Sequence, residues 1–336
     1  MPVRYPLRAK HNKGFLDNSA VRHLGSGMRS AILAPALALA VSLGAGPLAA
    51  APLLPAPVPL PTEAPAILLP TLPALPGLPA EPVRPALTAR MVEGEVVRMR
   101  DAFAREVKRP VASSPANDRA WIGMARTALA ADPTGIDHPQ LIVVVDRNPA
   151  VQSLRVIMAR PAGPWEIVGG AHVSSGQAGR FDHYLTPLGV FRHTDAILGY
   201  RAQGTYNENR IRGLGAKGMR VWDFGWQSAQ RTWGTDRSEG QIRFMMHATD
   251  PDVLEARLGR PASQGCVRLS ADVNRFLDLH GVLDADYERV AVTDIRYRAL
   301  LLPNRQPSML AGNILVVIDT GHEAAPKIAG QASPKG

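Results

Sequence analysis

The hydrophobic positions between residues 87 and 136 repeat with a helical period. In the first stretch, apolar residues recur three or four positions apart, at Val92, Val96, Met99, Phe103 and Val107. That spacing places them on one face of an amphipathic helix. A second helical stretch, from Asp118 to Ala131, ends at the Asp132-Pro133 dipeptide, because proline cannot continue a helix. The pattern therefore predicts a small helical region over residues 87–136.

After residue 137 the pattern changes to short apolar runs. Residues 141–145, 154–158 and 165–168 are rich in Val, Ile and Leu, and glycine, proline and asparagine separate them. This arrangement is typical of strands joined by tight connections. Further strands are predicted at 219–224, 241–246, 289–292 and 314–318. We expect a mostly β domain with a few helices over residues 137–320, and the sequence shows no internal repeat.

Two helices with clear boundary residues are expected inside the β domain. The first is predicted to begin with Asp250 as its N-cap and Pro251 at its first position, and to end at Gly259. Ser270 is predicted to cap a second helix, which ends at Gly281. The two predicted helices flank residues 260–269, where the candidate chemistry lies.

The N-terminal residues 1–50 have the pattern of an export signal. Residues 1–30 hold six bases and one acid, and an uncharged apolar run and several small residues follow. A basic segment, an apolar segment and a small-residue cleavage site describe a secretory signal peptide. Because the uncharged stretch continues to Pro61, an uncleaved membrane anchor is the alternative. Either way we predict that the body is exported to the periplasm or cell envelope.

Proline dominates the next segment. From Pro52 to Pro85 it recurs every few residues, and proline lacks the amide donor that helices and sheets need. We therefore predict an extended proline-rich linker over residues 51–86. Residues 321–336 are predicted to be a flexible tail.

Composition and charge exclude several classes of protein. The chain of 336 residues has a net charge of +9 and a single cysteine, so it has no internal disulfide and no site with several thiolate ligands. Without residues 1–30 the balance falls to 32 bases against 28 acids. Few aromatic residues are present for base stacking. We expect no nucleic-acid partner, and membrane contact only through the N-terminal segment.

The single cysteine lies among residues suited to acyl transfer. A thiol is only slightly ionised at neutral pH, and a nearby imidazole such as His247 can take its proton. Gly265 lets the backbone approach a carbonyl closely, and Arg268 adds a fixed positive charge. The alternative at this point is structural: Cys266 as a small buried hydrophobic residue and His247 as a cap or core residue.

The residues from His247 to Leu269 resemble the signature of the L,D-transpeptidase family (YkuD-type catalytic domain). His247 is followed by Ala-Thr, and downstream comes the sequence Ser263-Gln264-Gly265-Cys266-Val267-Arg268. The upstream run from Thr186 to Phe191 resembles the family's Thr-Pro-x-Gly-x-Phe element, and the similarity extends from Gln140 to about Ala291. One departure is Gln264, which stands where the family usually has a second histidine.

The resemblance implies a β-sandwich catalytic domain and a role for each signature residue. Cys266 is the expected nucleophile and His247 its base. Backbone amides around Gln264, Gly265 and Cys266 are expected to stabilise the oxyanion. Ser263 is expected to orient the histidine, and Arg268 to support the cysteine loop or the substrate. The expected substrates are peptidoglycan stem peptides, and neither a metal nor an organic cofactor is expected.

The acyl acceptor stays open at this stage. An amine of a neighbouring stem gives a 3–3 cross-link, and the amine of a wall-linked protein gives attachment of that protein. Water as the acceptor gives an L,D-carboxypeptidase or hydrolase. A non-catalytic cell-wall-binding module with an inert thiol is the remaining alternative.

Two other motifs predict no additional site. Gly213 to Gly218 fits G-x-G-x-x-G, but a strand-like sequence follows it, whereas the dinucleotide fold needs a helix there. His172, His183 and His193 lack the short spacing of metal ligands, so surface or packing roles are expected.

Overall fold

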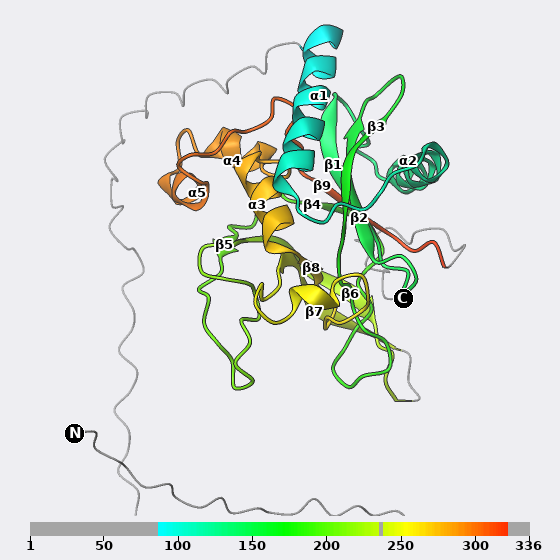
Figure 1. The fold of residues 1–336 in the computed structure, drawn as a ribbon, viewed down its shortest axis with the longest axis vertical. Helices are drawn as coiled ribbons and strands as arrows, with labels where there is room; N and C mark the ends of the chain where they lie inside the picture. Colours follow the sequence, from blue (N-terminus) through cyan, green and yellow to red (C-terminus); the bar gives the residue numbers. More distant parts are fainter. Residues whose placement is uncertain (1–86, 235–237, 322–336) are drawn as a thin grey trace, which may run out of the picture. The chain divides into compact units, whose positions relative to one another are not determined.

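The computed structural model describes residues 87–234 and 238–321 (Figure 1). The predicted signal segment, the proline-rich linker and nearly all of the predicted tail lie outside the described residues. The elements, in chain order, are α1 (Ala89–Glu106), α2 (Pro115–Ala130), β1 (Gln140–Asp146), β2 (Ser153–Ala159), β3 (Glu166–His172), β4 (Gly189–Arg192), β5 (Tyr200–Arg201), β6 (Arg220–Gln230), β7 (Glu239–Ala248), the 3₁₀ helix η1 (Glu255–Arg257), β8 (Val267–Leu269), α3 (Ala271–Leu279), α4 (Ala285–Val290), α5 (Ile295–Leu300) and β9 (Ile314–Ile318).

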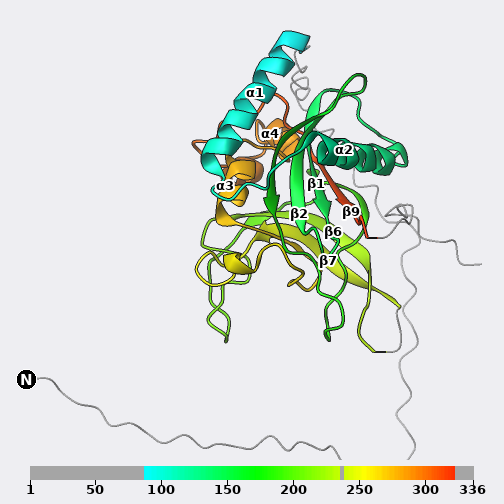
Figure 2. The same cartoon turned by 45° about the vertical axis from the view of Figure 1, so that its right-hand side comes forward.

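The strands form two mixed sheets, which confirms the expected mostly β fold. One sheet has the order β3-β2-β1-β9-β4 and the other β5-β6-β7-β8. Most neighbours are antiparallel, but β1 pairs with β9 and β7 with β8 in parallel. Figure 2 shows β6 and β7 below β1, β2 and β9. The two sheets are the layers of a β-sandwich.

The space between the sheets is the main hydrophobic core. Val143 and Val156 of the five-stranded sheet belong to the same buried cluster as Trp222 and Met246 of the four-stranded sheet. Since side chains alternate along a strand, the residues between these core positions point to the opposite faces of their sheets. The outer face of the four-stranded sheet is therefore free to carry polar chemistry.

The two N-terminal helices are confirmed, and each covers part of the five-stranded sheet. The apolar face of α1 joins the main core, where the Phe103 ring contacts Phe276 of α3 edge-on at 4.9 Å. A Cβ added at Gly169 of β3 would lie 2.3 Å from the Phe103 ring, so this glycine makes room for the aromatic side chain. On the other face, Trp121 and Leu129 of α2 pack in a second cluster.

Two sequence predictions were wrong. Residues 289–292 were expected to form a strand, but α4 ends at Val290 and a turn follows. Tyr287 and Ala291, four residues apart, bury one side of this helical segment, and that packing outweighs the β propensity of its valines. The helix expected after Asp250 is only a turn and the short η1. The buried Asp250 carboxylate accepts from both the Asp252 amide and the Arg212 side chain.

The remaining predicted elements are confirmed, although β3 runs four residues and β6 six residues past the predicted ends. Ser270 caps α3, since its Oγ accepts a hydrogen bond from the Val273 amide. The sequence patterns missed β4, β5, β8 and α5, which are two to six residues long. Elements this short carry too few residues for a hydrophobic period to emerge.

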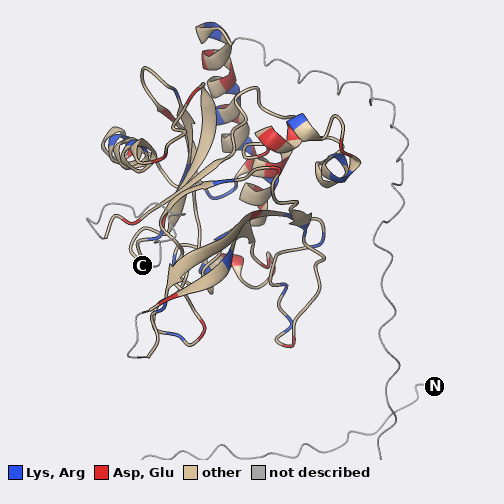
Figure 3. Ribbon diagram, turned by 180° about the vertical axis from the view of Figure 1, so that it is seen from behind, with Lys and Arg blue, Asp and Glu red and all other residues tan. Residues whose placement is uncertain are grey.

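Charged residues lie mainly outside the strands. Figure 3 shows Lys and Arg interspersed with Asp and Glu on α1 and α4, while the strands are mostly uncharged. None of the helices within residues 87–234 and 238–321 combines the length and the apolar character needed to cross a bilayer.

Replacing Phe103 with alanine should destabilise the fold by about 3–5 kcal/mol, because it leaves a cavity between α1, β3 and α3. Urea unfolding followed by circular dichroism measures the change. The matched control is Val97→Ala on the same helix, whose side chain is 55% exposed and whose loss should cost less than about 0.5 kcal/mol. Equal free energies of unfolding for the two variants would contradict this account of α1.

Candidate active site

The parallel pairing of β7 and β8 brings the predicted catalytic residues together. Met246 lies opposite Val267, and His247 lies opposite Arg268. Met246 and Val267 are buried in the main core, so the alternating residues point to the other face. Cys266 directly precedes β8 and lies two residues before Arg268. His247, Cys266 and Arg268 therefore gather at the outer face of the four-stranded sheet.

His247 is buried and held in one tautomer. Its Nδ1 lies 2.7 Å from the backbone oxygen of Ala248, so Nδ1 carries the proton that it donates there. Nε2 is then free to accept a proton. Burial, together with the charge of Arg268, lowers the pKa of His247 to about 4. The imidazole is consequently neutral at pH 7, which is the form a general base requires.

Cys266 rests as a protonated thiol. Burial raises the pKa of this thiol above its ordinary value, and the Asp223 carboxylate adds to the rise. The Met245 backbone and the charge of Arg268 act in the opposite direction. Sγ lies 3.7 Å from the backbone oxygen of Arg243, to which the thiol donates. Within the described residues no hydrogen bond joins Sγ to His247. Because the pKa of His247 is lowered and that of Cys266 is raised, both groups are uncharged at pH 7.

Ser263 organises the loop that carries the nucleophile. Its fully buried hydroxyl donates to the backbone oxygen of Cys266 at 2.6 Å and accepts from the Gly265 amide at 3.1 Å. Gly265 has a φ of +136°, a conformation that side chains disfavour. Ser263 was expected to orient the histidine. The structure instead places its hydroxyl within the cysteine loop, and Ala248 holds the His247 ring.

The backbone amides of the loop are not equivalent. The Gly265 amide is already bonded to Ser263, whereas the amides of Gln264 and Cys266 have no hydrogen-bond partner among the residues that the structure describes. Gln264 is exposed, and its backbone oxygen accepts from the Tyr184 amide at 3.2 Å. The free N–H of Cys266, on the nucleophile itself, is therefore the best candidate for an oxyanion donor.

Arg268 holds the cysteine loop by a hydrogen bond and shifts the pKa values of the site residues. Its Nη1 donates to the backbone oxygen of Ala262 at 3.1 Å. Its charge lowers the pKa of both Cys266 and His247. It therefore favours the thiolate over the thiol, and the neutral imidazole over its protonated form.

The same face carries polar residues that the sequence patterns did not single out. Asp223 of β6 is buried and pairs with Arg243 of β7 at 2.9 Å. The Tyr200 hydroxyl of β5 donates to the Met245 sulfur at 3.0 Å. Residues 243, 245 and 247 alternate along β7, and this period of two was the signal that could have identified them.

The strand predicted over residues 219–224 continues as β6 to Gln230. The register with β7 shifts between Asp223 and Trp226, and Gly225 has a φ of +79°. This bulge redirects the strand next to the candidate site. The two tryptophans beside this bulge differ in burial, because Trp222 is fully buried in the core and Trp226 is 65% exposed.

The segment from 173 to 187 lies against the cysteine loop. His183 Nδ1 is 2.9 Å from the backbone oxygen of Ser263, and the Thr186 hydroxyl donates to the backbone oxygen of Gly265 at 2.7 Å. Thr186 belongs to the run that resembles the family element, but the resemblance implied no role for it.

His183 and His193 are buried. The described residues hold no cluster of three His, Cys, Asp or Glu side chains that could bind a metal.

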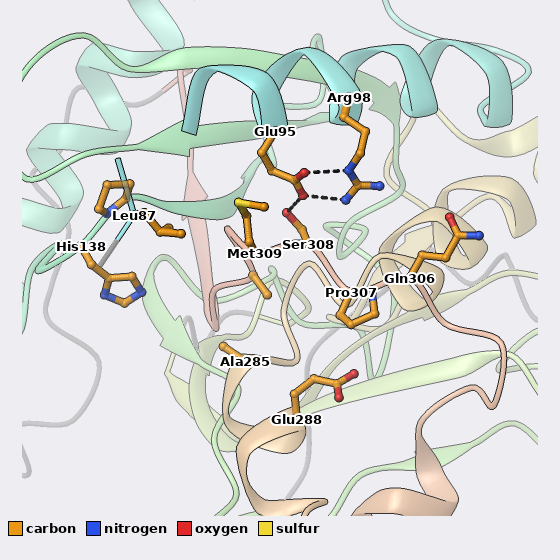
Figure 4. Close-up of a pocket in the computed structure, with 12 residues that line it drawn as sticks. Leu87, Glu95, Arg98, His138, Ala285, Glu288, Gln306, Pro307, Ser308 and Met309 are labelled. Carbon is orange, nitrogen blue, oxygen red and sulfur yellow. Dashed lines mark hydrogen bonds and ion pairs between the residues drawn. The ribbon is translucent and has the colours of Figure 1, made fainter. Parts of the chain in front are cut away.

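A pocket of about 880 Å³ lies elsewhere, between α1, α4 and residues 306–311 (Figure 4). Glu95 lines it and pairs with Arg98 at 2.6 Å, and Ser308 donates to Glu95 at 2.5 Å. None of the signature residues from His247 to Arg268 is among its lining residues. The pocket is therefore separate from the Cys266 site.

Comparison with protein families identifies the domain that contains this site. Residues 137–289 match the family model of the L,D-transpeptidase catalytic domain, YkuD. The chain therefore carries an L,D-transpeptidase catalytic domain. A comparison with curated proteins found no match.

The L,D-transpeptidase domain brings an activity of that general type, with peptidoglycan as the general substrate. The matched residues include His247 and Cys266 but end before β9. They also begin after α1 and α2, although both helices pack on the sheet of this domain. The helices and β9 are thus additions that complete the sandwich.

The pH dependence of alkylation should report the environment of Cys266. Because burial raises the thiol pKa, the rate of iodoacetamide alkylation should still be rising at pH 9. In Arg268→Gln the profile should move to higher pH, since a charge that favours the thiolate is lost. Arg275→Gln, an exposed position on α3, should leave the profile unchanged. A profile in Arg268→Gln that moves to lower pH would contradict this electrostatic account.

Removing the Ser263 hydroxyl should loosen the cysteine loop. Ser263→Ala leaves the Gly265 amide and the Cys266 carbonyl without their partner, which should cost about 1–3 kcal/mol in the free energy of unfolding. Chemical denaturation measures this cost. Ser263→Thr keeps the hydroxyl and is the control for its loss. An alanine variant as stable as the wild type would show that the hydroxyl contributes nothing to the loop.

Proposed function

We propose that this protein is a peptidoglycan L,D-transpeptidase that forms 3–3 cross-links between stem peptides. The observation that carries the proposal is the meeting of Cys266, His247 and Arg268 on one sheet face, within residues matched to an L,D-transpeptidase catalytic domain. A thiol beside a neutral imidazole and a fixed cation is suited to covalent acyl transfer.

The first half-reaction acylates the enzyme. Nε2 of His247 takes the proton of the Cys266 thiol, and Sγ attacks the carbonyl carbon of the third residue in a tetrapeptide stem. The carbonyl oxygen becomes an oxyanion, and the Cys266 amide donates a hydrogen bond to it. The bond to the terminal D-alanine then breaks, and its nitrogen takes the proton from His247. The stem remains on Cys266 as a thioester, and D-alanine leaves.

The second half-reaction transfers the stem to an amine. The amine of a neighbouring stem attacks the thioester carbonyl while His247 takes its proton. The carbon–sulfur bond breaks, and the proton returns to Sγ. The new amide is the 3–3 cross-link, or an attachment bond where the amine belongs to a wall-linked protein. Each step uses only the side chains and backbone already described.

We also propose that the domain acts in the cell envelope. Its general substrate, peptidoglycan, lies outside the cytoplasmic membrane. The sequence of residues 1–50 suits an export signal or anchor, and that of residues 51–86 suits a spacer between membrane and wall. These residues lie outside the described ranges, so this part of the proposal rests on their sequence alone.

Replacing Cys266 with alanine tests the proposed function. The variant should fold with an unchanged melting temperature and lose cross-linking altogether, because no thioester can form. Muropeptide profiling of cells with the wild type, with Cys266→Ala and without the protein measures the outcome. The expected result is a rise in 3–3 dimers with the wild type alone.

The profile also separates the other candidate functions. Conversion of tetrapeptides to tripeptides without new dimers would replace the transpeptidase with a carboxypeptidase. A carbapenem adduct on Cys266, detected by mass spectrometry, would support either acyl-transfer activity. Absence of both the adduct and any muropeptide change would contradict catalysis and support a binding module.

A further inference from the structure

We propose that Thr186 is a positioning residue, which holds the Gly265–Cys266 peptide so that the Cys266 amide faces the reacting carbonyl. The inference rests on the acyl-transfer function proposed above, and it assigns a task to a residue more than sixty positions away from the histidine and the cysteine. Thr186 does not touch substrate in this role. It acts through the backbone of the nucleophile.

The Thr186 hydroxyl has only one possible orientation. Its side chain is fully buried, and Oγ1 lies 2.9 Å from the Gly176 amide and 2.7 Å from the Gly265 carbonyl oxygen. The Gly176 amide is a donor, so Oγ1 must accept from it. The single hydroxyl proton is then directed at the Gly265 carbonyl.

Fixing this carbonyl also fixes the next amide. A trans peptide is planar, and its C=O and N–H point in opposite directions. The described residues contain no cis peptide bond. When Thr186 holds the Gly265 carbonyl, the Cys266 N–H must point away from Thr186. That N–H has no hydrogen-bond partner among the described residues, and it belongs to the nucleophile.

The loop needs such a restraint because it contains glycine. Gly265 has a φ of +136°, and a glycine backbone has other conformations within easy reach. Ser263 binds the Gly265 amide and the Cys266 carbonyl, but it does not bind the carbonyl of Gly265. Only the Thr186 hydroxyl among the described groups restrains that carbonyl directly.

Thr186 is itself held rigidly. Arg147 donates to its backbone oxygen at 2.5 Å and pairs with Asp319 at 3.1 Å. A Cβ added at Gly176 would lie 2.0 Å from the Tyr184 backbone oxygen, so the partner amide sits in a close backbone approach that requires glycine.

Backbone hydrogen bonds also join residues 174–175, in the segment that bears Thr186, to the cysteine loop. The amides of Ala262 and Ser263 both donate to the Ser175 oxygen at 3.0 Å. Arg268 and Ser174 exchange two backbone bonds, at 2.8 and 3.1 Å. The segment that bears Thr186 is thus a fixed support for the cysteine loop.

The test separates oxyanion stabilisation from thiol reactivity. Acylation of Cys266 by a carbapenem passes through a tetrahedral oxyanion, whereas alkylation by iodoacetamide does not. Removing a direct oxyanion donor slows reactions about 10²–10³-fold. We expect Thr186→Val to slow acylation about 10-fold or more and to change alkylation less than about twofold. Mass spectrometry of the intact full-length protein follows both rates.

Two further variants complete the design. Thr186→Ser retains the hydroxyl and should restore acylation to within about threefold of the wild type. Ser308→Ala removes a buried hydroxyl at the separate pocket and should leave both rates unchanged. If Thr186→Val does not fold, Thr186→Ala removes the same hydroxyl with a smaller side chain and takes its place.

The outcomes separate this inference from the function beneath it. A hydroxyl-free variant that acylates as fast as the wild type would overturn the role of Thr186 and leave the proposed function standing. Parallel loss of acylation and alkylation would also overturn it, because the thiol and not the oxyanion would then be affected. A wild type that alkylates but never acylates would overturn the acyl-transfer function and the role of Thr186 together.

Discussion

The parallel contact between β7 and β8 is the constraint on which the candidate site depends. β8 has only three residues, yet its register with β7 sets His247 opposite Arg268 and places Cys266 beside them. A shift of one residue would turn these side chains into the core. Core packing of Met246 and Val267 on one face, and the backbone bonds between Ser174 and Arg268 at the edge, hold the register.

Burial explains why the site rests in an uncharged state. It raises the pKa of Cys266 and lowers that of His247, so both groups are neutral before substrate arrives. Proton transfer would create a thiolate and an imidazolium that stabilise each other at short range. Arg268 favours the thiolate but opposes the imidazolium. In the proposed mechanism, the thiol thus stays protonated until a bound substrate carbonyl can take the developing charge.

The structure extends the catalytic domain beyond the residues that match the family. Helices α1 and α2 precede the match, and β9 follows it. Phe103 of α1 reaches the same core as Trp222 of the four-stranded sheet, and β9 lies at the centre of the other sheet between β1 and β4. Removing α1 or β9 would expose the core beneath the site, and removing α2 would expose the other face of the five-stranded sheet.

The sequence alone determined the long helices and most strands, and it singled out His247 and Cys266 as the candidate pair, because periodicity and a local motif are properties of neighbouring residues. It misplaced a strand at 289–292, where the packing of Tyr287 selects a helix. The Asp223–Arg243 pair and the bond from Thr186 to Gly265 join residues far apart in the chain. Only the tertiary structure decided them, because strand register and loop contacts depend on packing that no local pattern records.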